Sequence, residues 1–244
     1  MGVALVTGAS SGIGAAIAIA FADAGWEVMA AGRDENRLAE VADASENIST
    51  WAGELEESED CAELVADTIE EFGAIDSLIN CAGIILRGNV SETSDDNWRD
   101  TMSVNLDVPF FLSRAALPHL IRAEGSIVNI ASDWGLHGGK RAAAYCASKG
   151  GIVLLTRAMA QDHARDGLRI NAVCPGDVDT PMLAKEANDL DEDLDEYLAK
   201  LADESPNGRL AESEDIAAIT LFLASESARH INGVVIPVDG GASA

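Results

Sequence analysis

The sequence predicts an α/β fold in which helices cover both faces of a parallel β-sheet, a doubly wound arrangement. Short apolar runs rich in β-branched residues alternate with longer segments whose apolar residues recur at helical spacing. This is the pattern of parallel strands joined by crossover helices. The chain has 244 residues, of which 48% are hydrophobic, and this is enough to bury one substantial core. We therefore expect a single domain, residues 1–244, built on one seven-stranded sheet.

The predicted strands share a short length and flanking turn signals. In chain order they are residues 3–6, 27–31, 48–52, 77–79, 126–131, 169–173 and 234–237. The predicted helices between them are residues 13–24, 58–72, 93–104, 110–122, 145–163 and 213–224. Their lengths suit crossover connections, which are nearly always right-handed.

An acidic insertion, about residues 177–209, interrupts this alternation between the last two predicted strands. Its apolar residues recur at helical spacing, and they are Leu190, Leu194, Tyr197, Leu198 and Leu201. The intervening Asp and Glu residues would then face water. The pattern predicts a helical flap over a binding site, and the alternative is a solvated surface helix with no role.

The charge balance is strongly acidic. The net charge is -26, because 42 acidic residues face 16 basic ones, and nucleic acid is therefore excluded as a partner. Such a charge repels itself at low salt, and the repulsion fades at 1 M salt, where the screening length is about 3 Å. We therefore formulate the hypothesis of a halophilic protein in a salt-rich cytoplasm, and the alternative is an ordinary acidic enzyme.

Neither a membrane span nor secretion is predicted. No run of about 18 apolar residues occurs, and the first residues lack a basic segment, so we expect a cytoplasmic protein. The four cysteines, Cys61, Cys81, Cys146 and Cys174, form no C-x-x-C pair. Together with isolated histidines, their spacing predicts no metal site and no disulfide framework.

A glycine-rich turn follows the first predicted strand and opens the first helix. Glycines in such a turn allow a ligand to approach the backbone, and a helix N-terminus offers unpaired N–H groups to a pyrophosphate. A merely tight strand-to-helix connection is the alternative, and the place of the turn after the first strand favours a dinucleotide. The predicted contacts are Gly8, Ser10, Ser11, Gly12, Ile13 and Gly14.

The end of the second predicted strand indicates which dinucleotide is bound. Enzymes that use NAD often carry an acidic residue there for the ribose 2′-hydroxyl, but this chain has Gly32 and Arg33. A guanidinium can pair with a 2′-phosphate through its planar fork of donors, with help from Ser10. NADP is therefore favoured and NAD is the alternative, unless Arg33 simply caps the following loop.

Tyr145 and Lys149 are separated by four residues, so on one helix they share a face. A tyrosine that exchanges protons near neutrality needs a pKa below its usual value of about 10, and we expect the Lys149 ammonium to lower it. The spacing alone is weak evidence for a catalytic pair. Ser132 strengthens it, because this serine follows a predicted strand at the carboxyl edge, where open α/β sheets bind their ligands.

With these motifs in order, the chain resembles the classical short-chain dehydrogenase/reductase family over nearly its whole length. The glycine turn matches the family's glycine motif, and Asn80-Cys81-Ala82-Gly83 matches its N-N-A-G segment with a cysteine at the second place. Pro175-Gly176 and the sequence Val238-Asp239-Gly240-Gly241 match two further signatures. The resemblance implies a Rossmann-type fold and hydride transfer between a nicotinamide cofactor and a carbonyl or secondary alcohol.

The resemblance also implies roles for single residues. Ser132 would hold the substrate oxygen, Tyr145 would give or take its proton, and Lys149 would stabilise the phenolate and bind the nicotinamide ribose. Asn105 would complete the family's catalytic tetrad by positioning a water beside Lys149. Further cofactor contacts are implied at Glu54, Leu55, Asn80, Ala82, Gly83, Pro175, Gly176, Val178 and Thr180. Glu54 stands where the family usually has an aspartate.

The substrate and the assembly stay open in the sequence. The resemblance fits 3-oxoacyl reductases as well as sugar or polyol dehydrogenases, because the pocket rather than the scaffold sets the substrate. Asp133 and Trp134 follow the catalytic serine and are expected to line that pocket. A dinucleotide-binding regulator without catalysis is a different class, and the complete tetrad argues against it. The family implies a homotetramer or homodimer that pairs through the helices around residues 93–122 and 145–163.

Overall fold

The computed structural model describes residues 2–244, and its centre is one parallel sheet with the strand order β3-β2-β1-β4-β5-β6-β7. Every neighbouring pair of strands runs parallel. The strands are β1 Val3–Thr7, β2 Glu27–Gly32, β3 Ile48–Ala52, β4 Ser77–Asn80, β5 Ser126–Ile130, β6 Arg169–Pro175 and β7 Val235–Val238. The strand order reverses between β1 and β4, and ligands of such sheets bind outside the carboxyl ends at this point.

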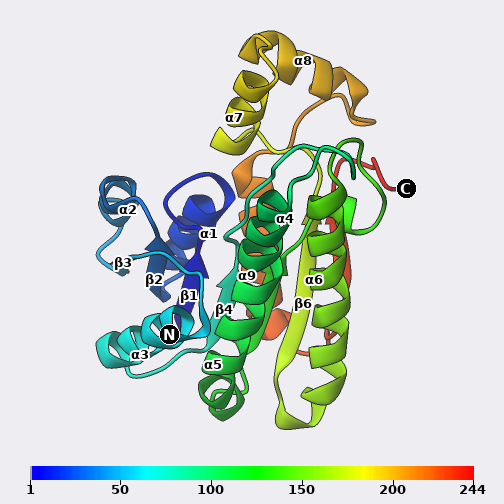
Figure 1. Cartoon of the computed structure of the whole chain (residues 1–244). Coiled ribbons are helices and arrows are strands. Elements are labelled where there is room, and N and C mark those ends of the chain that lie inside the picture. The colour runs from blue at the N-terminus through cyan, green and yellow to red at the C-terminus, as the bar shows by residue number, and fades with distance from the viewer. Residues whose placement is uncertain (1) are drawn as a thin grey trace.

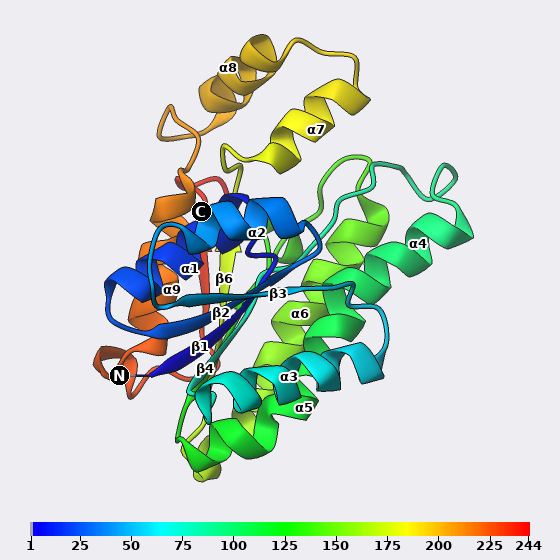
Figure 2. The same ribbon diagram turned by 90° about the vertical axis from the view of Figure 1, so that its left-hand side faces the viewer.

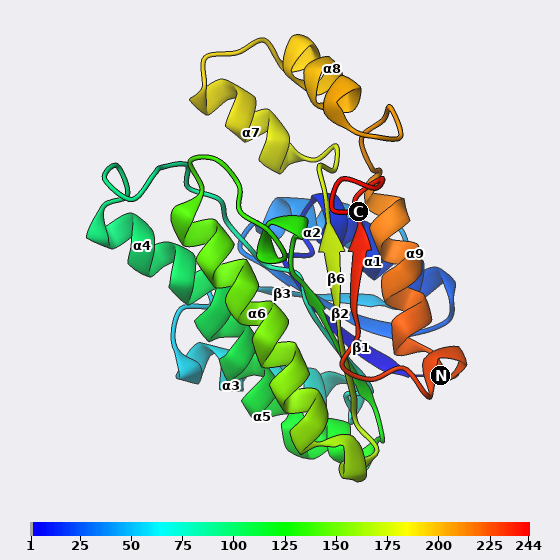
Figure 3. The same cartoon turned by 90° about the vertical axis from the view of Figure 1, so that its right-hand side faces the viewer.

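Helices cover both faces of the sheet, as Figures 1 to 3 show. One face carries α1 Gly12–Asp23, α2 Glu35–Ala42 and α9 Ser213–Ala224; the other carries α3 Ser58–Phe72, α5 Val108–Arg122 and α6 Ala143–Asp162. The remaining helices are α4 Asp95–Met102, α7 Pro181–Asp189 and α8 Leu194–Glu204. Between residues 2 and 244, no helix is long and apolar enough to cross a membrane.

The side chains of the apolar strands pack into two separate cores, because successive side chains of a strand point to opposite faces of the sheet. In β1, Ala4 and Val6 pack into the core under α1 and α9, whereas Leu5 packs into the core under α3 and α5. Burial on both faces explains why the strands read as continuous apolar runs. The doubly wound fold with a seven-stranded parallel sheet, predicted from the sequence, is confirmed.

Three local elements differ from the sequence-based prediction. The short helix α2 was not predicted, although Asp34 caps it by accepting a hydrogen bond from the backbone N–H of Arg37. The predicted helices 93–104 and 110–122 are not separated by a loop, because a π-helical turn, Ser103–Asp107, joins α4 to α5. The insertion forms two helices, α7 and α8, rather than one, and Leu190 lies just after the first.

The helices α7 and α8 stand above the end of the sheet at which β6 terminates (Figures 1 and 3). We call this α7–α8 segment the flap. It has a small apolar cluster of its own, with Leu183, Ala187 and Tyr197 buried between the two helices. The flap is therefore held together internally, while its position over the sheet depends on other contacts.

Candidate active site

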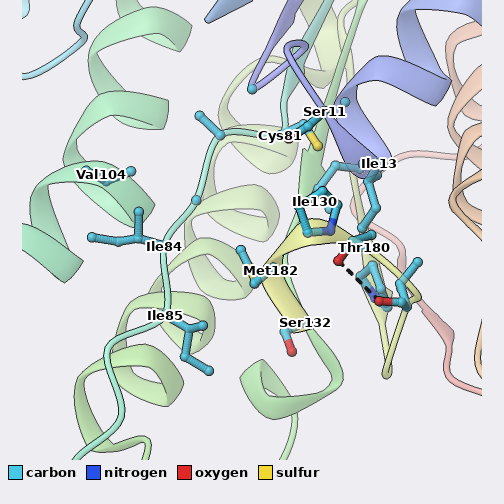
Figure 4. A pocket seen from close by; sticks show the side chains of 18 of the residues that line it. Ser11, Ile13, Cys81, Ile84, Ile85, Val104, Ile130, Ser132, Thr180 and Met182 are labelled. Atoms are coloured by element: carbon cyan, nitrogen blue, oxygen red, sulfur yellow. Dashed lines mark hydrogen bonds between the residues drawn. The ribbon is translucent and has the colours of Figure 1, made fainter. Parts of the chain in front are cut away.

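A cavity of about 340 Å³ opens at the carboxyl edge of the sheet, where the strand order reverses. Figure 4 shows part of its wall, with Ile84, Ile85 and Val104 on one side and Ile13 and Thr180 on the other. The cavity collects most of the residues predicted to bind the cofactor. They are Gly8, Ser10, Ser11, Gly12, Ile13, Gly14, Arg33, Glu54, Leu55, Ala82, Gly83, Pro175, Gly176, Val178 and Thr180.

The glycine turn between β1 and α1 fits a dinucleotide. Gly8 and Gly12 have positive φ angles of 68° and 54°, and a Cβ atom on Gly14 would lie 2.2 Å from the carbonyl oxygen of Gly8. Helix α1 begins without a side-chain cap and without an acidic residue in its first turn. Its first N–H groups are therefore available to an anion, and a pyrophosphate suits them.

Lys149, on α6, lines the cavity. Its Nζ donates a hydrogen bond to the carbonyl oxygen of Ile130, at 2.9 Å, and the side chain is buried. A Cβ atom on Gly83 would lie 3.3 Å from this Nζ, so the missing side chain leaves the ammonium open to the cavity. Burial lowers the pKa of Lys149 to about 8, because removal from water disfavours the charged form.

Tyr145 is also buried, one turn before Lys149 on the same helix. The Lys149 Nζ lies 5.7 Å from the centroid of the Tyr145 ring. Burial raises the pKa of Tyr145 above its usual value, and a hydrogen-bond contribution from Ser132 lowers it. The Lys149 ammonium is turned to the Ile130 carbonyl, and its expected lowering of the pKa of Tyr145 stays a prediction.

Ser132 lies at the end of β5 and begins the short 3-10 turn Asp133–Gly135. Its Oγ donates to Oδ1 of Asp133, at 2.9 Å, and accepts from the backbone N–H of Trp134, at 3.1 Å. The Trp134 ring meets the Tyr145 ring edge-on, with centroids 6.1 Å apart. The turn that follows Ser132 therefore also contacts Tyr145, and Asp133 and Trp134 line the cavity as expected.

Asn105 supports the site from outside the cavity wall. It is buried in the π-helical turn, where its Oδ1 accepts from the backbone N–H of Ile84, at 2.8 Å. Its Nδ2 donates to the carbonyl of Ile84, at 2.9 Å, and to Oγ of Ser148, at 3.1 Å. The side chain thus ties the loop after β4 to α6, and its role with a water beside Lys149 stays a prediction.

Asn80 differs in its position from the other predicted cofactor contacts. It is buried at the end of β4 and does not line the cavity. Its Nδ2 donates to Oδ1 of Asn129, at 2.8 Å, and to Oγ of Ser113, at 3.4 Å. The Nδ2 group of Asn80 therefore joins β4 to β5 and α5. Its Oδ1 is buried without a hydrogen-bond partner among residues 2–244, and a contact of Asn80 with the cofactor stays a prediction.

Arg87 is a site residue that sequence reasoning missed. It lies after β4, its guanidinium stacks on the Trp134 ring with 4.5 Å between the Cζ atom and the ring centroid, and it forms an ion pair with Glu186 on α7. Glu186 also accepts a hydrogen bond from the hydroxyl of Tyr197, at 2.9 Å. Arg87 therefore connects the flap to the ring that supports Tyr145, through partners far away in the sequence.

Comparisons with known proteins agree with this geometry. The family model described as enoyl-(acyl carrier protein) reductase matches residues 8–243. Meso-2,3-butanediol dehydrogenase of Serratia marcescens is 42% identical over 244 residues, which cover 99% of this chain and 94% of that enzyme. The chain belongs to the short-chain dehydrogenase/reductase family.

Two solved structures place this dehydrogenase/reductase among enzymes with diverse substrates. Aldohexose dehydrogenase of Thermoplasma acidophilum has 32% identity and a TM-score of 0.89, with 99% of this chain and 94% of that chain covered. A complex of actinorhodin polyketide ketoreductase with NADPH has 32% identity and a TM-score of 0.93, with 99% and 97% covered. The relatives are NAD(P)-dependent oxidoreductases, and this chain is an enzyme of the same kind.

Proposed function

We propose that this enzyme reduces a small hydroxylated carbonyl compound, or oxidises the matching alcohol, with NADP as its preferred cofactor. The observation that carries the proposal is that Ser132, Tyr145 and Lys149 line the same cavity as the glycine turn. Asn105 supports the cavity wall from behind through Ser148. A regulator without catalysis would not need this arrangement.

The residues support a simple division of work. The nicotinamide, when bound, supplies or accepts the hydride. Tyr145 gives a proton to the substrate oxygen during reduction and takes it during oxidation, while Ser132 hydrogen-bonds the same oxygen. Lys149, with its ammonium facing Gly83, binds the ribose hydroxyls of the cofactor. Its positive charge also favours the phenolate form of Tyr145 whenever the ammonium turns toward the hydroxyl.

The lining of the substrate end favours a sugar, polyol or diol over a 3-oxoacyl thioester. Asp133 offers carboxylate oxygens, Trp134 a flat ring and Arg87 a guanidinium at the cavity wall, and these groups suit hydroxyl-bearing substrates. The relatives named for butanediol and aldohexose point in the same direction. We propose that the flap, which contributes Met182, Leu183 and Glu186 to the wall, covers the bound substrate.

Arg33 supports the preference for NADP. It lines the cavity just after β2 and forms no side-chain hydrogen bond or ion pair within residues 2–244. The helix α2 is capped by Asp34 instead, so Arg33 is not needed as a cap. Ser10 lies beside Gly32, where a Cβ atom would be 3.2 Å from the Ser10 Oγ, and Arg33 follows Gly32 directly in the chain.

A spectrophotometric screen tests both parts of the proposal. Purified enzyme with NADPH or NADH is offered sugars, diols, hydroxyketones and 3-oxoacyl thioesters, and we expect turnover of a hydroxylated carbonyl with NADPH. Arg33→Ala should weaken NADPH use by about 10- to 100-fold, the effect of losing a charge-assisted pair, while NADH use stays unchanged. Absence of turnover with every carbonyl would contradict the proposed function. An equal loss of activity with NADPH and NADH in Arg33→Ala would contradict the role of Arg33.

The assembly and the location are proposed on surface features. Trp98 on α4, Phe110 on α5 and Leu154 on α6 are exposed apolar side chains, and they support a homotetramer or homodimer that pairs through these helices. The net charge of -26 supports a salt-rich cytoplasm. Size-exclusion chromatography with light scattering measures the oligomeric state directly.

The melting temperature is expected to rise with potassium chloride between about 0.1 M and 1 M, where the screening length falls from about 10 Å to 3 Å. The physical reason is the relief of repulsion among 42 acidic side chains. Calorimetry in potassium chloride measures the effect, and a matched series in sucrose, which screens no charge, is the control. A melting temperature independent of salt would rule out the hypothesis of a halophilic protein.

A further inference from the structure

A second cavity, of about 420 Å³, adjoins the catalytic cavity that contains Ser132, Tyr145 and Lys149. Apart from Gly176, none of the predicted cofactor contacts lines it. The residues that line both cavities are Arg87, Asp133, Trp134, Gly176 and Asp177. The two cavities therefore meet beside the turn that follows Ser132, and the second one lies on the side of the substrate rather than of the dinucleotide.

The walls of the second cavity come from segments that lie far apart in the sequence. They are the turn after Ser132, the end of α8 with the loop that follows it, and the end of the chain after β7. Figure 3 shows this loop and the end of the chain at the same end of the sheet. A Cβ atom on Gly240 would lie 2.7 Å from Cγ of Asn207, so the two segments are in direct contact. The flap and the end of the chain thus enclose the cavity together.

The wall of the second cavity offers hydrogen-bond acceptors and a donor that other residues do not use. The carboxylates of Asp177 and Glu204 form no hydrogen bond or ion pair within residues 2–244, and Nδ2 of Asn207 has no acceptor there. A hydroxyl both donates and accepts, so it can bond to a carboxylate oxygen and to an amide N–H. An acyl chain would remove these groups from water without replacing their hydrogen bonds. The lining therefore suits a part of the substrate that carries several hydroxyls.

The wall is also acidic, and its cations are already paired. Its carboxylates belong to Asp133, Asp177, Glu204, Asp215 and Asp239. Arg87 forms an ion pair with Glu186, and Arg209 forms one with Asp215. The third group that can carry a positive charge is His137, whose Nε2 lies 3.4 Å from Oδ2 of Asp133. Repulsion between like charges therefore disfavours a substrate with a carboxylate or a phosphate in this cavity.

We propose that the second cavity is a subsite for the distal hydroxyls of a neutral sugar or polyol. The inference rests on the proposed function and narrows it to a substrate that is longer than a diol and carries no anionic group. The reacting carbon lies at Ser132 and Tyr145, and the rest of the molecule passes Trp134 into the second cavity. Hydroxyls that reach Glu204 and Asn207 add affinity that a shorter substrate does not gain.

A series of polyols with NADP⁺ as the oxidant tests the length and the charge of the substrate. From glycerol through erythritol and xylitol to sorbitol, we expect kcat/KM to rise by about tenfold or more, the effect of a hydrogen bond to a charged group. Sorbitol 6-phosphate should be used about tenfold less well than sorbitol because the wall repels it. Equal kcat/KM for glycerol and sorbitol overturns the proposal. A strong preference for glucosaminitol, which carries an ammonium, also overturns it, because the cavity would then select a cation.

Leu201→Trp tests the place of the distal hydroxyls, because Leu201 lines only the second cavity. The larger ring fills the space, and we expect kcat/KM for sorbitol to fall by about tenfold while the value for glycerol stays unchanged. Leu194→Trp adds the same ring at an exposed position of α8 and is the matched control for damage to the flap. An unchanged value for sorbitol, or an equal loss for both polyols, contradicts the subsite.

Glu204→Ala tests the hydrogen bonds without filling the cavity, and Asp203→Ala is its matched control. Both changes remove one carboxylate near the end of α8, but only Glu204 lines the second cavity. In Glu204→Ala the KM for sorbitol should rise by about tenfold with little change in kcat, because the lost interaction holds the bound substrate and not the reacting atoms. The same rise in Asp203→Ala would assign the effect to the charge of the flap and overturn the contact.

Binding to the enzyme loaded with NADPH separates this inference from the proposed function, because an alcohol cannot react with the reduced cofactor. Saturation-transfer NMR measures the affinity of glycerol and of sorbitol for this complex. Sorbitol should bind about tenfold more tightly than glycerol, and Leu201→Trp should remove the difference, also in a protein that oxidises no polyol. Equal affinities in the unmodified enzyme contradict the inference even if the enzyme is active on short hydroxyketones.

Discussion

Tyr145→Phe is expected to lower kcat by about 10²- to 10⁴-fold, the usual contribution of a well-placed general acid or base. Phenylalanine keeps the ring that packs edge-on against Trp134 and removes only the hydroxyl beside Ser132. Because the ring stays, the fold and the cofactor site should be retained. Steady-state kinetics measure kcat, and calorimetric titration with NADPH measures cofactor affinity, which we expect to change by less than about threefold.

Tyr197→Phe is the matched control, since Tyr197 is the only other tyrosine of the chain. Its hydroxyl donates to Glu186 in the flap, away from the proton-transfer step. Loss of a single hydrogen bond to a charged acceptor costs about 1.5–3 kcal/mol at most, and it should appear in KM or stability rather than in a collapse of kcat. Near-wild-type turnover in Tyr145→Phe would show that another group transfers the proton.

The sequence predicts the sheet well because burial on both faces leaves a direct trace in it. The strand Val3–Thr7 is buried at every position and apolar at all but Thr7, and the turn glycine Gly8 follows it. The order of the motifs then places Ser132, Tyr145 and Lys149 at one edge without any knowledge of side-chain contacts. The fold and most of the cavity wall therefore followed from local chemistry.

Other features depend on contacts between distant residues, and the sequence could not predict them. Asn80 lies in a family motif, but its Nδ2 donates a hydrogen bond to Asn129 on the neighbouring strand. Burial raises the pKa of Tyr145, and the Lys149 ammonium points to the Ile130 carbonyl. Neither feature is visible in a spacing of four residues. The sequence contains only one weak indication of helix α2, the capping residue Asp34.

Arg87→Met is expected to release the flap. The side chain of Glu186 is only 4% exposed and is paired with Arg87. Removing one partner of a buried ion pair leaves an uncompensated charge, at a cost of about 3–5 kcal/mol. Because the flap has its own small core of Leu183, Ala187 and Tyr197, we expect the cost to appear as detachment of α7 and α8 rather than as global unfolding.

Hydrogen exchange measured by mass spectrometry over residues 181–204 tests this expectation. In Arg87→Met, amides of α7 and α8 should exchange at least about 100-fold faster, the equivalent of about 3 kcal/mol, while the sheet strands keep their protection. The KM for substrate should rise as well, since the flap contributes Met182 and Leu183 to the cavity wall. Unchanged exchange in the flap would mean that the ion pair does not hold it.

The double variant Arg87→Met with Glu186→Gln decides whether charge is the cause. Glutamine accepts the Tyr197 hydroxyl hydrogen bond without bringing a buried charge, so most of the lost protection should return. A double-mutant cycle with both single variants isolates the coupling of the pair. If the double variant is as unprotected as Arg87→Met, the charge left on Glu186 is not the cause, and the flap depends on the Arg87 side chain itself, which also stacks on Trp134 with 4.5 Å between the Cζ atom and the ring centroid.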